Sequence, residues 1–160
     1  MDVINTEKIK MVITDFDGII TDNCLYVDNN GNMTRKINFK DVMAFSILQK
    51  NGIKTAIISG ESNAAIEILA KKFDIKEIHQ NIRNKIQVLK DIIEKYSLSK
   101  EEFLYIGDDI NDYEALMYSK NAFTVPEAVD KIKSISHIKI TKSPSGAGAF
   151  REIVDILIKN

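Results

Sequence analysis

The sequence predicts an α/β fold: a parallel sheet with helices on both faces and a β-hairpin after the first strand. Short apolar runs rich in β-branched and aromatic residues alternate with longer stretches of helical period. Such alternation is typical of a Rossmann-like parallel sheet that is covered on both sides. No repeat, low-complexity tract or proline-rich linker interrupts the pattern. We therefore expect one domain that spans residues 1–160.

Five strands and five helices are expected in order. The predicted strands are 10–16, 53–59, 76–80, 102–108 and 121–125, and the predicted helices are 41–51, 62–72, 84–96, 111–119 and 127–133. The exception follows the first strand, where two short strands flank Asn29-Asn30-Gly31, a sequence that tolerates the positive φ angles of a tight turn. A calcium loop counted from Asp28 would need glycine and glutamate where Met33 and Phe39 stand, so we predict a hairpin.

Composition limits the possible partners. The chain has 22 basic and 23 acidic residues, and its net charge of −1 creates no field that attracts nucleic acid or an anionic membrane. An anionic substrate must therefore be held by local groups. Cys24 is the only cysteine, no apolar run approaches the ~20 residues of a spanning helix, and the N-terminus lacks the apolar stretch of a signal peptide. We expect a cytoplasmic protein.

Aspartates gather where strands are predicted to end. Asp15 and Asp17 close the first strand, and Asp108 and Asp109 close "FLYIGDD". Ligands of open α/β sheets bind beyond the carboxyl ends of the strands, so neighbouring strands would bring these carboxylates together. Two like charges ~4 Å apart repel by about 4 kcal/mol, a large share of a domain's roughly 5–15 kcal/mol of stability. A hard cation offsets this repulsion, and a few carboxylates with room for waters and a phosphate favour Mg²⁺.

Other interpretations of the aspartates remain open. They could be solvated turn formers or helix caps, a role that suits Asp22 in particular. A zinc site is disfavoured because His79 and His137 stand apart from any cysteine or histidine cluster.

Two further segments suggest phosphate binding. "IISG" ends a predicted strand at Ser59-Gly60, where a hydroxyl and backbone N–H groups could hold phosphate oxygens. The alternative is an ordinary turn in which Ser59 or Ser62 caps the next helix. Lys85 opens the helix after Asn84 and could place a positive charge on a phosphate, although a single lysine is usually solvent-exposed.

The order of "DFDGIITD", "IISG", "NK" and "GDDINDYE" resembles the haloacid dehalogenase superfamily of phosphohydrolases over almost the whole chain. The resemblance implies an aspartyl-phosphate mechanism and a role for each motif. The implied roles are Asp15 as nucleophile, Asp17 as general acid and base, Mg²⁺ on Asp15, the Asp17 carbonyl and Asp108, phosphate binding by Ser59, Gly60 and Lys85, and support from Asp109 and Asp112. Covalent catalysis with charge neutralisation suits phosphate esters, but the residues alone do not show which of Asp15 and Asp17 attacks.

Only the hairpin and one helix separate the first two motifs, so we expect no cap domain and an open site. A small chain of this kind, with the tail "SGAGAFREI", resembles the 3-deoxy-D-manno-octulosonate 8-phosphate phosphatases and their relatives that act on nonulosonate 9-phosphates. Those proteins are tetramers whose subunits close each other's sites. The resemblance therefore implies a homotetramer.

Three residues bear on the substrate. Octulosonate-type members usually have arginine after "SG", whereas Glu61 with Lys72 is similar to the 2-keto-3-deoxynononate 9-phosphate phosphatases. The alternative is that Glu61 favours a helix N-terminus and Lys72 lies in solvent. Arg151 resembles a tail arginine that reaches a substrate, or it belongs to a helix that Ser145 caps after a flexible turn.

We therefore expect a Mg²⁺-dependent phosphatase that releases the terminal phosphate of a 2-keto-3-deoxy sugar acid, with a nonulosonate 9-phosphate favoured and octulosonate 8-phosphate as the alternative. Asn23 and Val42 replace glycines that are common in octulosonate members, which leaves the substrate open. A receiver domain is disfavoured because its phosphorylated aspartate ends a middle strand and its lysine follows the last one. A non-catalytic oligomerisation domain, like that of some sialic-acid cytidylyltransferases, is the remaining rival.

Overall fold

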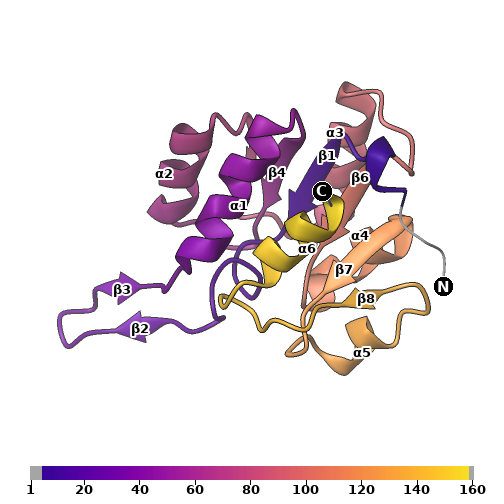
Figure 1. Cartoon of the computed structure of the whole chain (residues 1–160). Helices are drawn as coiled ribbons and strands as arrows, with labels where there is room; N and C mark the ends of the chain where they lie inside the picture. Colours follow the sequence, from indigo (N-terminus) through magenta and orange to yellow (C-terminus); the bar gives the residue numbers. More distant parts are fainter. Residues whose placement is uncertain (1–4, 159–160) are drawn as a thin grey trace.

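The computed structural model describes residues 5–158 and has a six-stranded sheet at its centre (Figure 1). The strands, all paired in parallel, follow the order β5-β4-β1-β6-β7-β8. Their bounds are β1 (Met11–Thr14), β4 (Lys54–Ile58), β5 (Glu77–His79), β6 (Phe103–Ile106), β7 (Asn121–Thr124) and β8 (Lys139–Ile140). The predicted parallel sheet is confirmed, and β8 is an edge strand that the sequence did not indicate.

Helices cover both faces of the sheet, as predicted. One layer holds α1 (Phe39–Lys50), which contacts α2 (Ala64–Phe73) and α6 (Ala149–Leu157). The other holds α3 (Lys85–Lys95), which contacts α4 (Tyr113–Tyr118), and α5 (Asp130–Lys133) packs beside α4. Figure 1 shows α1 and α6 in front of the sheet and α3 and α4 behind it. Two short 3₁₀ turns, η1 (Thr6–Lys8) and η2 (Ile110–Asp112), complete the described elements.

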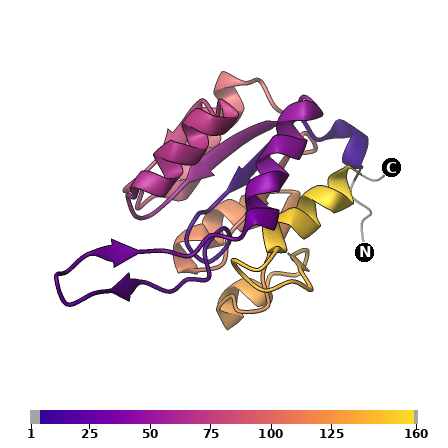
Figure 2. The ribbon, with the colours of Figure 1, turned by 60° about the vertical axis from the view of Figure 1, so that its left-hand side comes forward.

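A hairpin of β2 (Tyr26–Val27) and β3 (Met33–Thr34) follows β1 and extends away from the sheet in both views (Figures 1 and 2). Gly31 has φ 81°, the positive angle expected in this turn. The Asp28 carboxylate accepts hydrogen bonds from the backbone N–H groups of Asn30 and Asn32 at 2.8 and 2.9 Å. Both of these bonds reach Oδ1, and the Asn32 side-chain amide donates to Oδ2 at 2.7 Å, so the turn itself occupies the oxygens that a calcium loop would need. The hairpin prediction is confirmed.

Some helix boundaries differ from those expected. The helix predicted at 127–133 is reduced to α5, because residues 126–128 form a turn and bend after Pro126. The helix predicted at 111–119 begins as the 3₁₀ turn η2. α2 is capped by Asn63, whose side chain accepts from Ile66 N–H at 3.2 Å, so neither Ser59 nor Ser62 is its cap.

The start of α6 is held by a carboxylate from another helix. Asp41 of α1 is fully buried and accepts from the backbone N–H groups of Gly148 and Arg151, each at 3.0 Å. Gly148 is the N-cap and offers no side chain, so the Ser145 cap, which was the alternative interpretation of this segment, is not formed. The rings of Phe45 and Phe150 lie 4.7 Å apart between their centroids and join the same two helices in the core.

Candidate active site

Three neighbouring strands deliver the predicted site residues to one edge of the sheet. Asp15 follows β1, Ser59 follows β4, and Asp108 comes two residues after β6. β1 lies between β4 and β6, so the residues that follow these three strands are neighbours at the carboxyl edge of the sheet. At this point the strand order reverses direction, which is where ligands of such sheets bind. Together with Asp17, Gly60 and Asp109 they line a cavity of about 420 Å³ that is open to solvent.

Lys85 lies beneath this cavity and connects two aspartates. Its Nζ is 2.7 Å from Asp15 Oδ2 and 2.9 Å from Asp112 Oδ1, and its side chain is fully buried. Burial opposes the charge of Lys85, but the carboxylates of Asp112 and Asp15 outweigh it, so the pKa of this lysine is raised. Lys85 is thus a positive charge in direct contact with Asp15. The alternative, that Lys85 is solvent-exposed, is wrong.

The carboxylates still carry more negative charge than Lys85 can neutralise. Burial, and then the charge of Asp112, raise the pKa of Asp15 well above its usual value, although Lys85 acts against them. Burial followed by Asp112 raises the pKa of Asp108 to about 7. Raised values in a group of neighbouring acids show that the site is short of positive charge, as the sequence argument about repulsion required.

Carboxylate oxygens of this site suit a metal ion. Asp15, Asp108 and Asp112 each bring one oxygen within 4.8 Å of the others. Within residues 5–158, Asp108 Oδ1 and Asp17 Oδ2 are buried without a hydrogen-bond partner. Unpaired buried carboxylate oxygens are costly unless a cation or water meets them, and an all-oxygen donor set fits Mg²⁺.

Asp112 differs from the other two members because both its oxygens are already used. Oδ1 accepts from Lys85 and from the Tyr105 hydroxyl at 2.8 Å, and Oδ2 lies 3.3 Å from the backbone nitrogen of Asp108. These bonds suit a residue that orients Lys85 and the Asp108 loop. Asp109 accepts from Ile110 N–H at 2.6 Å and caps η2, so the helix-cap interpretation holds for this aspartate.

Asp17 is tied to the hairpin. Its Oδ1 accepts from Arg35 Nε at 2.9 Å and from Thr21 Oγ1 at 3.1 Å. Sequence reasoning missed Arg35, because no spacing rule indicates that the end of the hairpin folds back onto the loop after β1. It also passed over Asn23 as a contact, whose Nδ2 lies 3.5 Å from Asp108 Oδ2.

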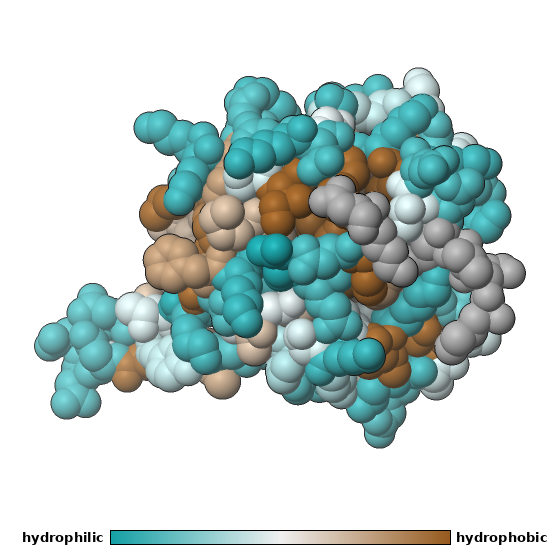
Figure 3. Space-filling model, viewed as in Figure 1, coloured by the Kyte–Doolittle hydropathy of each residue, from teal (hydrophilic) through white to brown (hydrophobic). Residues whose placement is uncertain are grey.

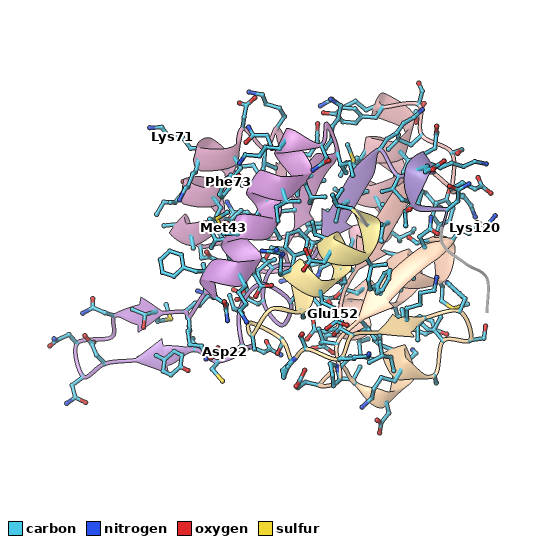
Figure 4. All side chains as sticks on the ribbon, viewed as in Figure 1. Asp22, Met43, Lys71, Phe73, Lys120 and Glu152 are labelled. Atoms are coloured by element: carbon cyan, nitrogen blue, oxygen red, sulfur yellow. The ribbon has the colours of Figure 1, made fainter. Side chains whose placement is uncertain are left out.

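The three predicted specificity residues do not lie together. Glu61 lines the cavity. Lys72 is exposed, with its Nζ 5.4 Å from the centroid of the Phe73 ring, and it does not line the cavity. In Figure 4, Phe73 lies above Asp22, with Met43 labelled between them. Arg151 pairs with Asp155 at 2.7 Å and lines a separate cavity. Within one chain, only Glu61 is near the carboxylates.

A parallel sheet that presents buried aspartates and a lysine at its carboxyl edge suits an enzyme that acts on phosphate groups. Residues 28–153 match the family of haloacid dehalogenase-like hydrolases, and the chain belongs to this family. Residues 5–158 contain no cap domain, which matches the KdsC structures among its solved relatives.

The similar proteins include phosphatases of one kind. The 3-deoxy-D-manno-octulosonate 8-phosphate phosphatase KdsC of Haemophilus influenzae is 30% identical over 154 residues, which cover 96% of this chain and 84% of the relative. KdsC of Escherichia coli K12 is 28% identical over 156 residues, which cover 98% and 82%. The Moraxella catarrhalis phosphatase, solved with a magnesium ion, a phosphate ion and a KDO molecule, superposes with a TM-score of 0.90 at 29% identity, over 96% of this chain and 88% of the other.

Proposed function

We propose that this protein is a Mg²⁺-dependent phosphatase of a 2-keto-3-deoxy sugar-acid phosphate. The observation that carries the proposal is the contact of Asp15 with the buried, charged Lys85, in a cavity where oxygens of Asp17 and Asp108 are left without partners. The magnesium and sugar acid bound by the Moraxella relative support it.

Asp15 is the proposed nucleophile. One of its oxygens forms a bond to phosphorus while the bond to the sugar oxygen breaks, and Asp17 gives that oxygen its proton. Lys85, the Ser59 hydroxyl and the backbone at Gly60 hold the phosphoryl oxygens. Asp15, the Asp17 carbonyl and Asp108 would hold Mg²⁺, which neutralises charge on the phosphoryl group.

Water completes the reaction. Asp17, now ionised, takes a proton from a water molecule that attacks the phosphorus of the aspartyl-phosphate, and Asp15 and inorganic phosphate are released. The Arg35 and Thr21 contacts hold Asp17 Oδ1, so Oδ2 is the oxygen free to exchange this proton. Asp112 and Asp109 support the site through Lys85 and the loop after β6.

The substrate we favour is a nonulosonate 9-phosphate, because Glu61 lines the cavity and offers a carboxylate to sugar hydroxyls. Octulosonate 8-phosphate is the alternative, since curated relatives of this chain are named as phosphatases of that substrate. Values of kcat/KM for the two phosphates, measured side by side, decide the matter. We expect a higher kcat/KM for the nine-carbon substrate. If Glu61→Arg no longer shows this preference, the preference depends on Glu61.

We also propose that the protein is a homotetramer. Apolar side chains are exposed along the hairpin, α1 and α2, including Phe39 at 84%, Ile68 at 65% and Met33 at 64%. Figure 3 shows hydrophobic residues gathered on the side of the molecule where α1 and α2 lie. Contiguous exposed apolar residues are typical of protein interfaces. Lys72 and Arg151 would then meet substrate only in a neighbour's site. Light scattering tests the assembly, and a monomer would contradict it.

The activity itself is tested with p-nitrophenyl phosphate. Release of p-nitrophenol should require Mg²⁺ and fall about a thousandfold or more in Asp15→Asn, which removes the nucleophile. Asp91→Asn is the matched control, because Asp91 lies exposed on α3, where it accepts from Gln87 Nε2 at 2.8 Å, and does not line the cavity. A folded protein without Mg²⁺-dependent turnover would favour the non-catalytic oligomerisation domain.

A further inference from the structure

We propose that Arg83 pairs with the carboxylate of the substrate and sets the preference of this enzyme for sugar-acid phosphates over phosphates that lack a carboxylate. This inference rests on the proposed function and adds a residue to it. Arg83 lines the same cavity as Asp15 and Asp17. Its side chain is exposed, and no hydrogen bond or ion pair engages its guanidinium within the described part of the chain.

The charges around the cavity explain why a cation is needed. Its other ionisable lining residues are all acids: Asp15, Asp17, Glu61, Asp108 and Asp109. Among the described residues that line the cavity, Arg83 is therefore the one that could pair with a substrate carboxylate through opposite charge. Lys85 is not among the residues that line the cavity, and in the proposed mechanism its charge, beside Asp15, serves the phosphoryl group.

The backbone holds Arg83 at a suitable place. Ile82 N–H donates to the Ser59 carbonyl at 3.0 Å, which fixes the preceding residue against the proposed phosphate-binding turn. Asn84 caps α3, and Lys85 follows as its first residue. Arg83 is therefore anchored on both sides, while its guanidinium remains available at the cavity rim. One short segment would supply a cation for each end of the substrate, Lys85 for the phosphate and Arg83 for the carboxylate.

Guanidinium chemistry fits this task. Its planar fork binds a carboxylate through two parallel hydrogen bonds, which a lysine cannot reproduce. The two other cations predicted to meet substrate, Lys72 and Arg151, lie outside this cavity in the same chain. Arg83 thus provides recognition that does not depend on a neighbouring subunit.

The test compares substrates with and without a carboxylate. For 2-keto-3-deoxynononate 9-phosphate, Arg83→Gln should lower kcat/KM by about tenfold to a hundredfold, mainly through KM, because a charged hydrogen-bonded pair is lost. For p-nitrophenyl phosphate the loss should be several times smaller. Arg83→Lys should recover part of the activity toward the acid. Lys90→Gln is the control for removal of a cation, since Lys90 lies exposed on α3 with its Nζ 5.4 Å from the Tyr118 ring centroid.

The outcomes of this comparison separate a failure of the Arg83 inference from a failure of the proposed function. Equal losses for both substrates would assign Arg83 to the phosphoryl group and overturn the inference, as would no loss for either. Failure of the unmodified protein to hydrolyse any phosphate ester would instead overturn the proposed function, and this inference with it. Calorimetric titration with the dephosphorylated sugar acid gives a readout besides turnover, and weaker binding to Arg83→Gln than to the unmodified protein is expected.

Discussion

Gly18 determines how closely the loop after β1 approaches Asp108. Its φ is 86°, and a Cβ at this position would lie 2.1 Å from Asp108 Oδ2. Glycine is therefore required twice, for the backbone angle and for the space. The residue gives the carboxylate room at the place where we propose magnesium.

Replacing Gly18 should damage the site more than the fold. In Gly18→Ala the new methyl group must displace the Asp108 carboxylate, so we expect at least a tenfold loss of kcat and a higher Mg²⁺ requirement. Gly31→Ala is a matched control, because Gly31 has a similar φ of 81° but nothing within 4 Å of the added Cβ. Both variants should lose about 1 kcal/mol of stability in denaturant titrations from backbone strain. Equal activity of the two variants would contradict the role given to Gly18.

The aspartates and the lysine at the centre of the site could be predicted from the sequence, but the arginines around them could not. Asp15, Asp108 and Lys85 could be found because each follows or opens an element whose hydrophobic pattern is clear. Arg35 could not, since its contact with Asp17 depends on how the hairpin folds back. Arg83 stands two residues before Lys85, yet no pattern told whether its side chain faced the cavity or solvent.

Among the elements, α6 depends on α1 for its N-terminus. The buried Asp41 carboxylate accepts backbone N–H groups of the first turn, and negative charge at a helix N-terminus is favourable. Burial raises the pKa of Asp41, while these backbone hydrogen bonds act in the opposite direction. The aspartate thus links two helices that are distant in sequence.

Loss of this link should destabilise the protein. Asp41→Ala leaves one buried and one partly buried N–H group without this partner, so we expect the free energy of unfolding to fall by about 2–3 kcal/mol in urea titrations. Asp41→Asn keeps one acceptor and should lose less. Equal stability of Asp41→Ala and the unmodified protein would show that water satisfies these groups.

The elements themselves were predictable where periodicity was strong and less so at their ends. Strands β1 and β6 and the second half of β4 are buried and mostly apolar because helices bury both faces of the sheet. β8 has only two residues, too few for any pattern, and it forms through pairing with β7. α5 is shorter than expected because residues 126–128 form a turn and bend, and Val129 N–H donates to the Asp108 carbonyl at 3.1 Å instead of continuing a helix from residue 127.

For the whole molecule, the acidic site couples stability to pH and metal. The pKa of Asp108 is about 7 in the folded protein, above the value near 3.9 of an unfolded aspartate, and that of Asp15 is also raised. The folded state therefore binds these protons more tightly than the unfolded chain. The contribution of Asp108 to stability is complete below about pH 4 and is lost as the pH rises through about 7, and the raised pKa of Asp15 acts in the same direction.

Magnesium should reverse that loss. Without metal, the melting temperature is expected to fall by several degrees between about pH 5 and about pH 7.5, and Mg²⁺ should raise it more at the higher pH, where it replaces protons. Differential scanning calorimetry at each pH, with magnesium or with a chelator, measures both effects. In Asp108→Asn, which removes one titrating group, the metal-free decline should be smaller. A magnesium effect that is independent of pH would contradict this coupling.

The helices of residues 5–158 are too short or too polar for any of them to span a membrane.

Gly146 packs directly on the segment that follows the proposed nucleophile, since a Cβ there would lie 2.4 Å from the Asp22 backbone nitrogen, and its own N–H donates to the Ile19 carbonyl at 3.1 Å. During synthesis the nucleophile's loop leaves the ribosome more than a hundred residues before the segment that supports it. We therefore expect the loop that follows Asp15 to adopt its folded conformation only after the residues near 146 have been synthesised. A nascent chain that ends before them should show no enzymatic turnover.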